Sequence, residues 1–255
     1  MDGNGDKKTV KLRIYRRDPK KESSGRFVEY EAPVEEGMVV LDAVRYVEQY
    51  VDTSLAVRWN CKAARCGSCA AEINNRPALM CKTRVDELGS TITVAPMHVF
   101  PLIKDLVTDV SRNYDIDRKI PGFAPKDMQS PWRIAQMDVE RTKEFRKCIE
   151  CFLCMDVCHV VREHDADYVG PRHVVKAASL DMHPMDTLDR SEYLNRSGGL
   201  GLCNITKCCQ EVCPEDIKIT DNAIIPEKER AADSFYDPIA RLFKRARKGG
   251  AEDGV

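Results

Sequence analysis

The sequence predicts an α+β fold in two parts, a small sheet with one helix in the N-terminal part and helices in the C-terminal part. Val10, Leu12 and Ile14 alternate with charged residues, and "RFVEYEAPV" (26–34) follows as a second stretch of strand character, as in a half-buried hairpin. Beyond about residue 140, helical spacing and strong helix formers predominate. The twelve cysteines fall into three groups of four, which lie at 61–81, 148–158 and 203–213.

Residues 1–105 are predicted to form one mixed sheet. A helix is expected in "MVVLDAVRYVEQYV" (38–51), where apolar residues recur at helical spacing. The stretch "AEINNRPALMC" (71–81) is typical of a strand, an Asn-Asn turn and a second strand. "STITVAPM" (90–97) adds one more strand.

Residues 106–140 are predicted to be a connecting segment, because "NYDIDRKIPGFAPKDMQSPW" (113–132) is rich in proline, glycine and aspartate. Residues 141–255 are predicted to form an all-α domain. Its expected helical stretches are "DVERTKEFRKCIEC" (138–151), "PRHVVKAASLDMH" (171–183) and "DPIARLFKRARK" (237–248). "DMHPMDTLDR" (181–190) groups His183 with carboxylates, which suits a metal site and equally a helix end with a proline turn.

Composition limits the classes of function. A net charge of −1 gives no general case for nucleic-acid binding, and no apolar stretch approaches the length of a membrane span. The N-terminus has no secretory or import pattern, so the cysteines are expected to be reduced thiols and not disulfides. Twelve thiols without disulfides predict metal or cluster ligation.

The first group has the spacing Cys61-x₄-Cys66-x₂-Cys69, and Cys81 completes a quartet. This is the spacing of plant-type [2Fe-2S] sites. Small residues within the loop allow backbone N–H groups to approach the sulfides. The alternative is a structural zinc site, which more often pairs two C-x₂-C units.

The second and third groups resemble interleaved bacterial ferredoxin runs. In C-x₂-C-x₂-C-x₃-C-P, the fourth cysteine ligates the other cluster of a two-cluster protein. This rule predicts a [4Fe-4S] cluster on four cysteines, which are Cys148, Cys151, Cys154 and Cys213.

The remaining ligands, Cys158, Cys203 and Cys209, are predicted to hold a [3Fe-4S] cluster. The fourth corner faces Thr206, whose hydroxyl is a poor iron ligand beside thiolates. Cys208 is then spare. It is interpreted as a buried or neighbouring thiol, with rescue of the vacant corner as the alternative.

The chain resembles the iron–sulfur subunits of succinate dehydrogenase and fumarate reductase, the complex II family. The resemblance covers nearly the whole chain. Its motifs are "RWNCKAARCGSC", "RPALMCKT", "FPLIKDLVTDV", "RKCIECFLCMDVC" and "CNITKCCQEVCP". It implies a plant-ferredoxin-like β-grasp domain followed by a bacterial-ferredoxin-like α-helical domain.

The resemblance also implies a role without a catalytic site of its own. The chain would pass electrons from the FAD of a flavoprotein subunit, through the three clusters, to quinone at a membrane anchor that can also hold heme b. The subunit would lie on the cytoplasmic face of the bacterial cell membrane. It would have no membrane span of its own and no nucleic-acid partner.

The quinone site of ubiquinone-reducing relatives does not carry over. There the cysteine matching Cys158 precedes a proline and a tryptophan pair, whereas "HVVREHDAD" follows here, and Asn204 replaces a histidine. The resemblance therefore favours the menaquinone branch. His159, Arg162, His164 and Asn204 are candidate quinone-proximal residues, and a satisfied helix end or a solvated surface explains the charged ones equally well.

Three other functions remain as alternatives. The first is the same subunit in a quinol:fumarate reductase, which runs in the reverse direction. The second is a subunit of a soluble flavoenzyme, whose expected additional cysteine-rich modules are missing from this sequence. The third is a zinc-stabilised interaction protein, which would be colourless.

Overall fold

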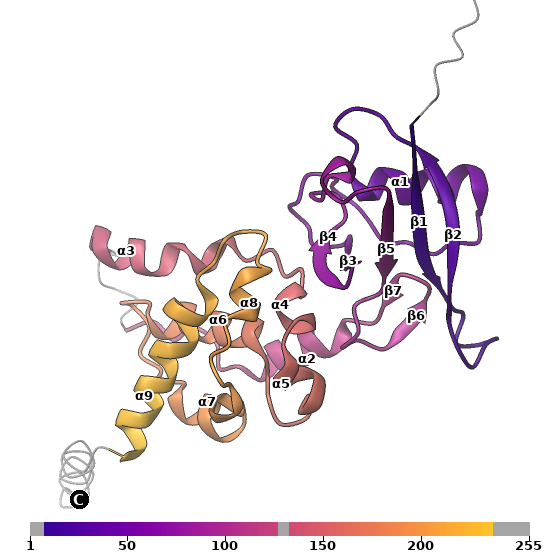
Figure 1. The fold of residues 1–255 in the computed structure, drawn as a ribbon. Coiled ribbons are helices and arrows are strands. Elements are labelled where there is room, and N and C mark those ends of the chain that lie inside the picture. The colour runs from indigo at the N-terminus through magenta and orange to yellow at the C-terminus, as the bar shows by residue number, and fades with distance from the viewer. Residues whose placement is uncertain (1–7, 127–132, 237–255) are drawn as a thin grey trace, which may run out of the picture.

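The computed structural model describes residues 8–126 and 133–236 of the chain. Its sheet-rich part and its helical part lie side by side, with β1 (Thr9–Arg16) and α9 (Ile225–Tyr236) at opposite ends of the molecule (Figure 1). The helical stretch expected at 237–248 lies outside the described residues.

Within residues 8–126, five strands form a mixed sheet in the order β2-β1-β5-β3-β4. β1 pairs antiparallel with β2 (Arg26–Pro33) and parallel with β5 (Thr91–Ala95). β3 (Ala70–Ile73) pairs antiparallel with β5 and with β4 (Arg76–Leu79). The predicted Asn-Asn turn joins β3 to β4, and both asparagines have positive φ, at 49° and 63°, as a tight hairpin requires.

One helix covers the core of this sheet. α1 (Val40–Tyr46) continues as a π-helical turn over Val47–Val51, within the predicted helical stretch. Its apolar face is buried together with Leu12, Ile14 and Val94 of the central strands. Alternation in the strands and helical spacing in α1 therefore bury the same core.

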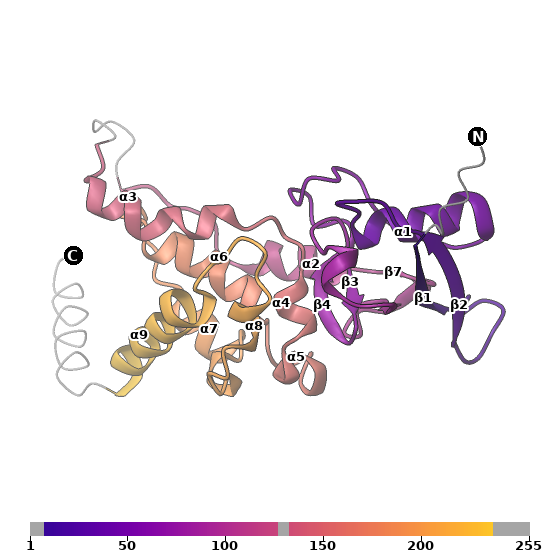
Figure 2. The same cartoon turned by 45° about the horizontal axis from the view of Figure 1, so that its top comes forward.

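The predicted connecting segment contains regular secondary structure. β6 (Leu102–Lys104) and β7 (Val107–Thr108) form a hairpin, and Ser111–Lys119 form the helix α2, which lies where the two parts meet (Figure 2). Helix α2 buries Asn113 and Ile116, and its Asp117 pairs with residues of α6. These long-range contacts outweigh the loop-like local composition.

The helical part consists of short helices around cysteine-bearing loops. Its 3₁₀ turns are Phe145–Lys147 and Leu200–Leu202, and a π-helical stretch, Ile219–Ile224, precedes α9. The other helices are α3 (Gln136–Lys143), α4 (Leu153–Asp156), α5 (His159–Glu163), α6 (Pro171–Asp181), α7 (Ser191–Arg196) and α8 (Cys208–Glu211). The predicted helices at 138–151 and 171–183 correspond to α3 and α6, although the first ends before its cysteines.

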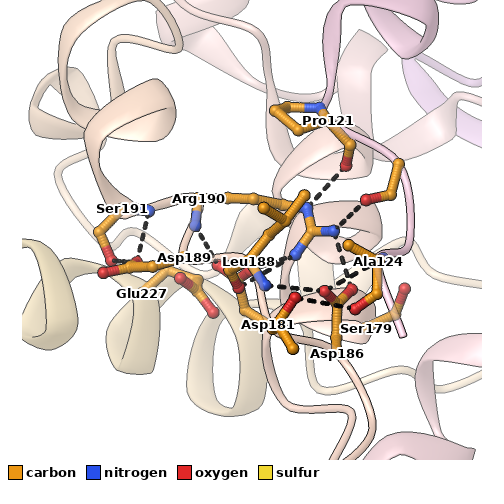
Figure 3. Close-up of polar contacts among 12 residues, drawn as sticks. Pro121, Ala124, Ser179, Asp181, Asp186, Leu188, Asp189, Arg190, Ser191 and Glu227 are labelled. Carbon is orange, nitrogen blue, oxygen red and sulfur yellow. Dashed lines mark hydrogen bonds and ion pairs between the residues drawn. The ribbon is translucent and has the colours of Figure 1, made fainter. Parts of the chain in front are cut away.

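Arg190 anchors the connecting segment to the helical part (Figure 3). Its guanidinium is fully buried and pairs with Asp181 at 2.6 Å and Asp186 at 2.8 Å. It also donates to the carbonyls of Pro121 and Gly122, at 2.7 and 2.6 Å. The carboxylates at 181–190 therefore bind a buried arginine, which supports the structural explanation of this stretch over a metal site.

Candidate metal centres

The loop at 61–69 curls around the Sγ atom of Cys61. Lys62, Ala64 and Gly67 have positive φ values of 54°, 53° and 68°. This curvature brings the backbone N–H groups of Ala63 and Arg65 to 3.4 and 3.3 Å from Cys61 Sγ. Donors of this kind stabilise a thiolate, as the sequence predicted for a cluster loop.

The other thiols of this group lie at the same end of the sheet. Cys69 immediately precedes β3 and Cys81 follows β4, and Met80 N donates to Cys69 O at 3.1 Å across the hairpin. Burial, with the neighbouring Cys81 and Cys66 thiolates, raises the pKa of Cys69 to about 12. Burial would also raise the pKa of Cys66, but hydrogen bonds from Ser68 and Cys61 lower it to about 7. Cationic iron would stabilise all four thiolates.

Gly67 brings this loop against the next cysteine run. A Cβ atom on Gly67 would lie 2.6 Å from Cys151 Cα and 2.8 Å from Cys151 Cβ. Arg65 also pairs with Glu215 at 3.7 Å, and Lys82 Nζ donates to Pro214 O at 2.6 Å. The first and second cysteine groups are therefore in direct backbone contact.

The two helical cysteine loops have the same backbone pattern. Positive φ values occur at Glu150 and Phe152, at 55° and 62°, and at Ile205 and Lys207, at 62° and 64°. A short helix, α4 or α8, follows each loop directly. In this register Thr206 takes the place of Cys151, so the threonine occupies the position that a fourth thiolate would have.

One pocket is lined by the four cysteines that are predicted to hold the [4Fe-4S] cluster. Its lining includes Cys148, Cys151, Cys154 and Cys213, together with Arg172. Burial, with the thiolates of Cys148 and Cys213, raises the pKa of Cys151 to about 12, and burial also raises the pKa of Cys154 well above its usual value. Four desolvated thiols facing one pocket fit a [4Fe-4S] cluster, which supplies the positive charge that they lack.

The three cysteines that are predicted to hold the [3Fe-4S] cluster lie near a buried tyrosine. Tyr168 is 1% exposed, and its hydroxyl makes no hydrogen bond of ordinary geometry with the described residues, although the Cys203 thiol lies beside it. Burial raises its pKa, and so do the nearby Cys203, Cys158 and Cys209 thiolates. Because a buried hydroxyl without a partner is costly, this donor fits a site that contains additional sulfur acceptors.

Thr206 and Cys208 lie together at the edge of the third group. Thr206 is exposed, and its Oγ1 is 3.4 Å from Cys208 Sγ. In the shared loop pattern Cys208 corresponds to Leu153, a residue that packs in the core and does not face the four-thiol pocket. Cys208 therefore has the place of a neighbouring thiol.

The structure separates the four candidate quinone-proximal residues. Asn204 Nδ2 lies 2.8 Å from His159 Nε2, and both residues are exposed beside the third group. Arg162 donates to the carbonyl oxygen of Asp156 in α4 at 2.9 Å. Its guanidinium also lies 3.7 Å from Glu72 in β3, on the side of the sheet. His164 is exposed at the C-terminal end of α5.

Two further features bear on the alternatives. In residues 8–126 and 133–236, no three His, Cys, Asp or Glu side chains converge on a point that one metal ion could occupy. None of the helices described is long and apolar enough to cross a membrane.

Sequence reasoning did not identify Arg172 or Tyr168. Arg172 follows a proline at the start of α6, a position where an arginine ordinarily faces water. Tyr168 lies in a loop without a motif. Only the packing of α6 against the cysteine loops brings both residues to the thiols.

The chain matches two sequence families and several curated proteins. Residues 11–115 match the 2Fe-2S iron-sulfur cluster binding domain, and residues 144–217 match the 4Fe-4S dicluster domain. The fumarate reductase iron-sulfur subunit of Mycobacterium tuberculosis is 31% identical over 82% of this chain and 87% of its own length. The succinate dehydrogenase iron-sulfur subunit of Bacillus subtilis is 26% identical over 90% and 96%. Other relatives are longer, and the chain spans 44% of the length of two of them.

A solved structure gives the same result. A chain of the Mycobacterium smegmatis Sdh1 complex in the apo form is 54% identical, with a TM-score of 0.86 over 91% of this chain and 98% of that one. The sheet-rich part with a two-iron family match, the helical part with a dicluster match and the full-length relatives agree. The chain belongs to the family of iron–sulfur electron-transfer subunits of succinate dehydrogenase and fumarate reductase.

Proposed function

We propose that this chain is the electron-transfer subunit of a membrane-bound succinate:quinone oxidoreductase with three clusters. The observation that carries the proposal is the contact of the Gly67 loop with Cys151, because it brings two cysteine groups within reach of electron transfer. When bound, the clusters accept and release single electrons between the FAD of a flavoprotein subunit and quinone at a membrane anchor. The same path serves a quinol:fumarate reductase in reverse.

The proposed ligand sets follow the predicted assignment. Cys61, Cys66, Cys69 and Cys81 hold a [2Fe-2S] cluster in a plant-ferredoxin-like β-grasp domain, and Cys148, Cys151, Cys154 and Cys213 hold a [4Fe-4S] cluster in an α-helical ferredoxin domain. Cys158, Cys203 and Cys209 hold a [3Fe-4S] cluster, with Thr206 at the vacant corner. The shared φ pattern supports this assignment, because it aligns Thr206 with the ligand Cys151.

The proposed quinone contact lies at the His159–Asn204 pair. Both side chains are exposed beside the third cysteine group, and their 2.8 Å contact holds two polar groups together at the surface. Exposed Leu202 and Ile205 flank the pair and suit an apolar partner. This arrangement supports contact with a membrane anchor, and the departure of 159–167 from the ubiquinone-type motif supports menaquinone as its quinone.

Electron paramagnetic resonance of the purified complex tests the third cluster. A [3Fe-4S] cluster is paramagnetic when oxidised, whereas an oxidised [4Fe-4S] cluster is silent, so the air-oxidised protein should give a signal. Thr206→Cys should recruit a fourth iron and abolish that signal, and Thr206→Ser, which adds no thiol, should retain it. A wild-type protein without the signal, but with full iron content, would contradict the assignment.

Cys208 provides the complementary test. If Cys208 is a neighbouring thiol, Cys208→Ser should leave both the oxidised signal and the iron content unchanged. If the wild-type protein is silent and Cys208→Ser becomes paramagnetic with one iron fewer, Cys208 is the fourth ligand.

A further inference from the structure

Arg172 is a buried cation in the lining of the four-thiol pocket. It is the second residue of α6, follows Pro171 and is 5% exposed. The pocket that it lines also contains Cys148, Cys151 and Cys154. A buried charge is costly unless it has compensating partners, so this position requires an electrostatic explanation.

Two carboxylates compensate part of this charge. Arg172 Nη2 donates to Asp117 of α2 at 3.2 Å and to Glu150 of the cysteine loop at 2.5 Å. Asp117 is shared, because His173 Nδ1 lies 2.9 Å and Lys176 Nζ 3.3 Å from its carboxylate. Asp117 is thus shared among several groups on α6, so it compensates only part of the positive charge of Arg172 beside the pocket.

The Nε–H donor of Arg172 is buried and has no partner among the described residues. Burial would lower the pKa of Arg172, but the Cys148 thiolate, Asp117 and Glu150 raise it above its usual value. An arginine guanidinium is always charged in a protein, and a sulfur atom in the pocket would satisfy the free Nε–H donor.

We propose that Arg172 sets the midpoint potential of the four-iron centre by placing a fixed positive charge, with a free N–H donor, against its sulfur atoms. The proposal rests on the proposed four-iron ligand set. Reduction adds one negative charge to the cluster, so a buried cation stabilises the reduced form more than the oxidised form. Hydrogen bonds to cluster sulfurs act in the same direction. Arg172 therefore raises the potential.

The test is a redox titration of the assembled complex in which the electron paramagnetic resonance signal of each cluster is measured at each potential. Arg172→Met removes the charge and the donor. We expect at least a tenfold fall in the reduced-to-oxidised ratio of the four-iron cluster at a fixed potential, which is about 59 mV for a one-electron couple. The midpoint potentials of the other two clusters should stay unchanged.

Lys176→Met is the matched control. Lys176 lies one turn further along α6, pairs with the same Asp117 and is outside the lining of the four-thiol pocket. Lys176→Met removes one positive charge from the same network. It should shift the midpoint potential of the four-iron cluster much less than Arg172→Met does. Equal shifts for the two variants would overturn a specific role of Arg172.

Iron and sulfide analysis separates this inference from the ligand assignment. A wild-type protein without a four-iron signal would contradict the proposed function itself. A variant with full cluster content and an unchanged potential would overturn only the role of Arg172. If Arg172→Met does not load clusters, Arg172→Gln gives up the charge with a smaller change in shape and polarity, and the same lowered potential is expected of it.

Discussion

Replacing Gly67 by alanine tests the contact between the first two cysteine groups. The new Cβ atom would lie 2.6 Å from Cys151 Cα and 2.8 Å from Cys151 Cβ, which is too close for non-bonded carbon atoms. Cys151 Cα belongs to the backbone of a cysteine loop, so it cannot rotate away as a flexible side chain would. One of the two loops must move.

The expected cost has two parts. Gly67 has a φ of +68°, and a left-handed conformation costs a residue with a Cβ about 1–2 kcal/mol. Overpacking at a rigid contact costs about 1–3 kcal/mol more. The sum is about 2–5 kcal/mol, and at about 2–4 °C per kcal/mol for a domain of this size the melting temperature should fall by on the order of 10 °C.

Gly89→Ala is the control for the conformational part. Gly89 has a φ of +83°, and a Cβ atom there would have no neighbour within 4 Å. It should therefore cost only about 1–2 kcal/mol. The assay compares the thermal unfolding of both variants by circular dichroism and their rates of electron transfer between the two-iron and four-iron clusters.

The Gly67→Ala variant should also transfer electrons more slowly, because the displaced loops lie further apart. If Gly67→Ala and Gly89→Ala lower the melting temperature equally, with equal transfer rates, the proposed contact does not hold the two loops together.

Three further predictions concern buried polar groups. Arg190→Met should cost about 3–5 kcal/mol of unfolding free energy, because Asp181 and Asp186 lose their buried cation; a denaturant titration that gives less than 1 kcal/mol would contradict this. Glu227 is fully buried, and desolvation and Asp181 raise its pKa to about 8. Because the folded state holds a proton that the unfolded state releases, the contribution of the protonated Glu227 to stability is lost as pH rises from about 4.5 to about 8. Glu227→Gln should therefore melt above the wild type at pH 9, with the advantage gone at pH 5. Tyr168→Phe should lower the midpoint potential of the third cluster alone in a redox titration, since it removes the buried hydroxyl that would donate to a cluster sulfur.

Much of the fold was accessible from local patterns. Alternation predicted β1 and β2, helical spacing predicted α1 and α6, and the Asn-Asn pair predicted the hairpin between β3 and β4. These patterns succeed because each depends on neighbours within a few residues. Over Ser111–Lys119, within the predicted connecting segment, the chain forms a helix that its composition did not indicate, and Asp117 of this helix contacts α6.

The sequence by itself determined the ligand types and their local spacing. Cysteines separated by two residues must turn toward a common side of one tight loop. The sequence alone also shows that Thr206 interrupts this spacing. Tertiary structure alone decided which residues surround the thiols. Arg172, Tyr168 and Gly67 reach the cysteine groups through contacts with residues distant in sequence, and packing, not local propensity, brings such residues together.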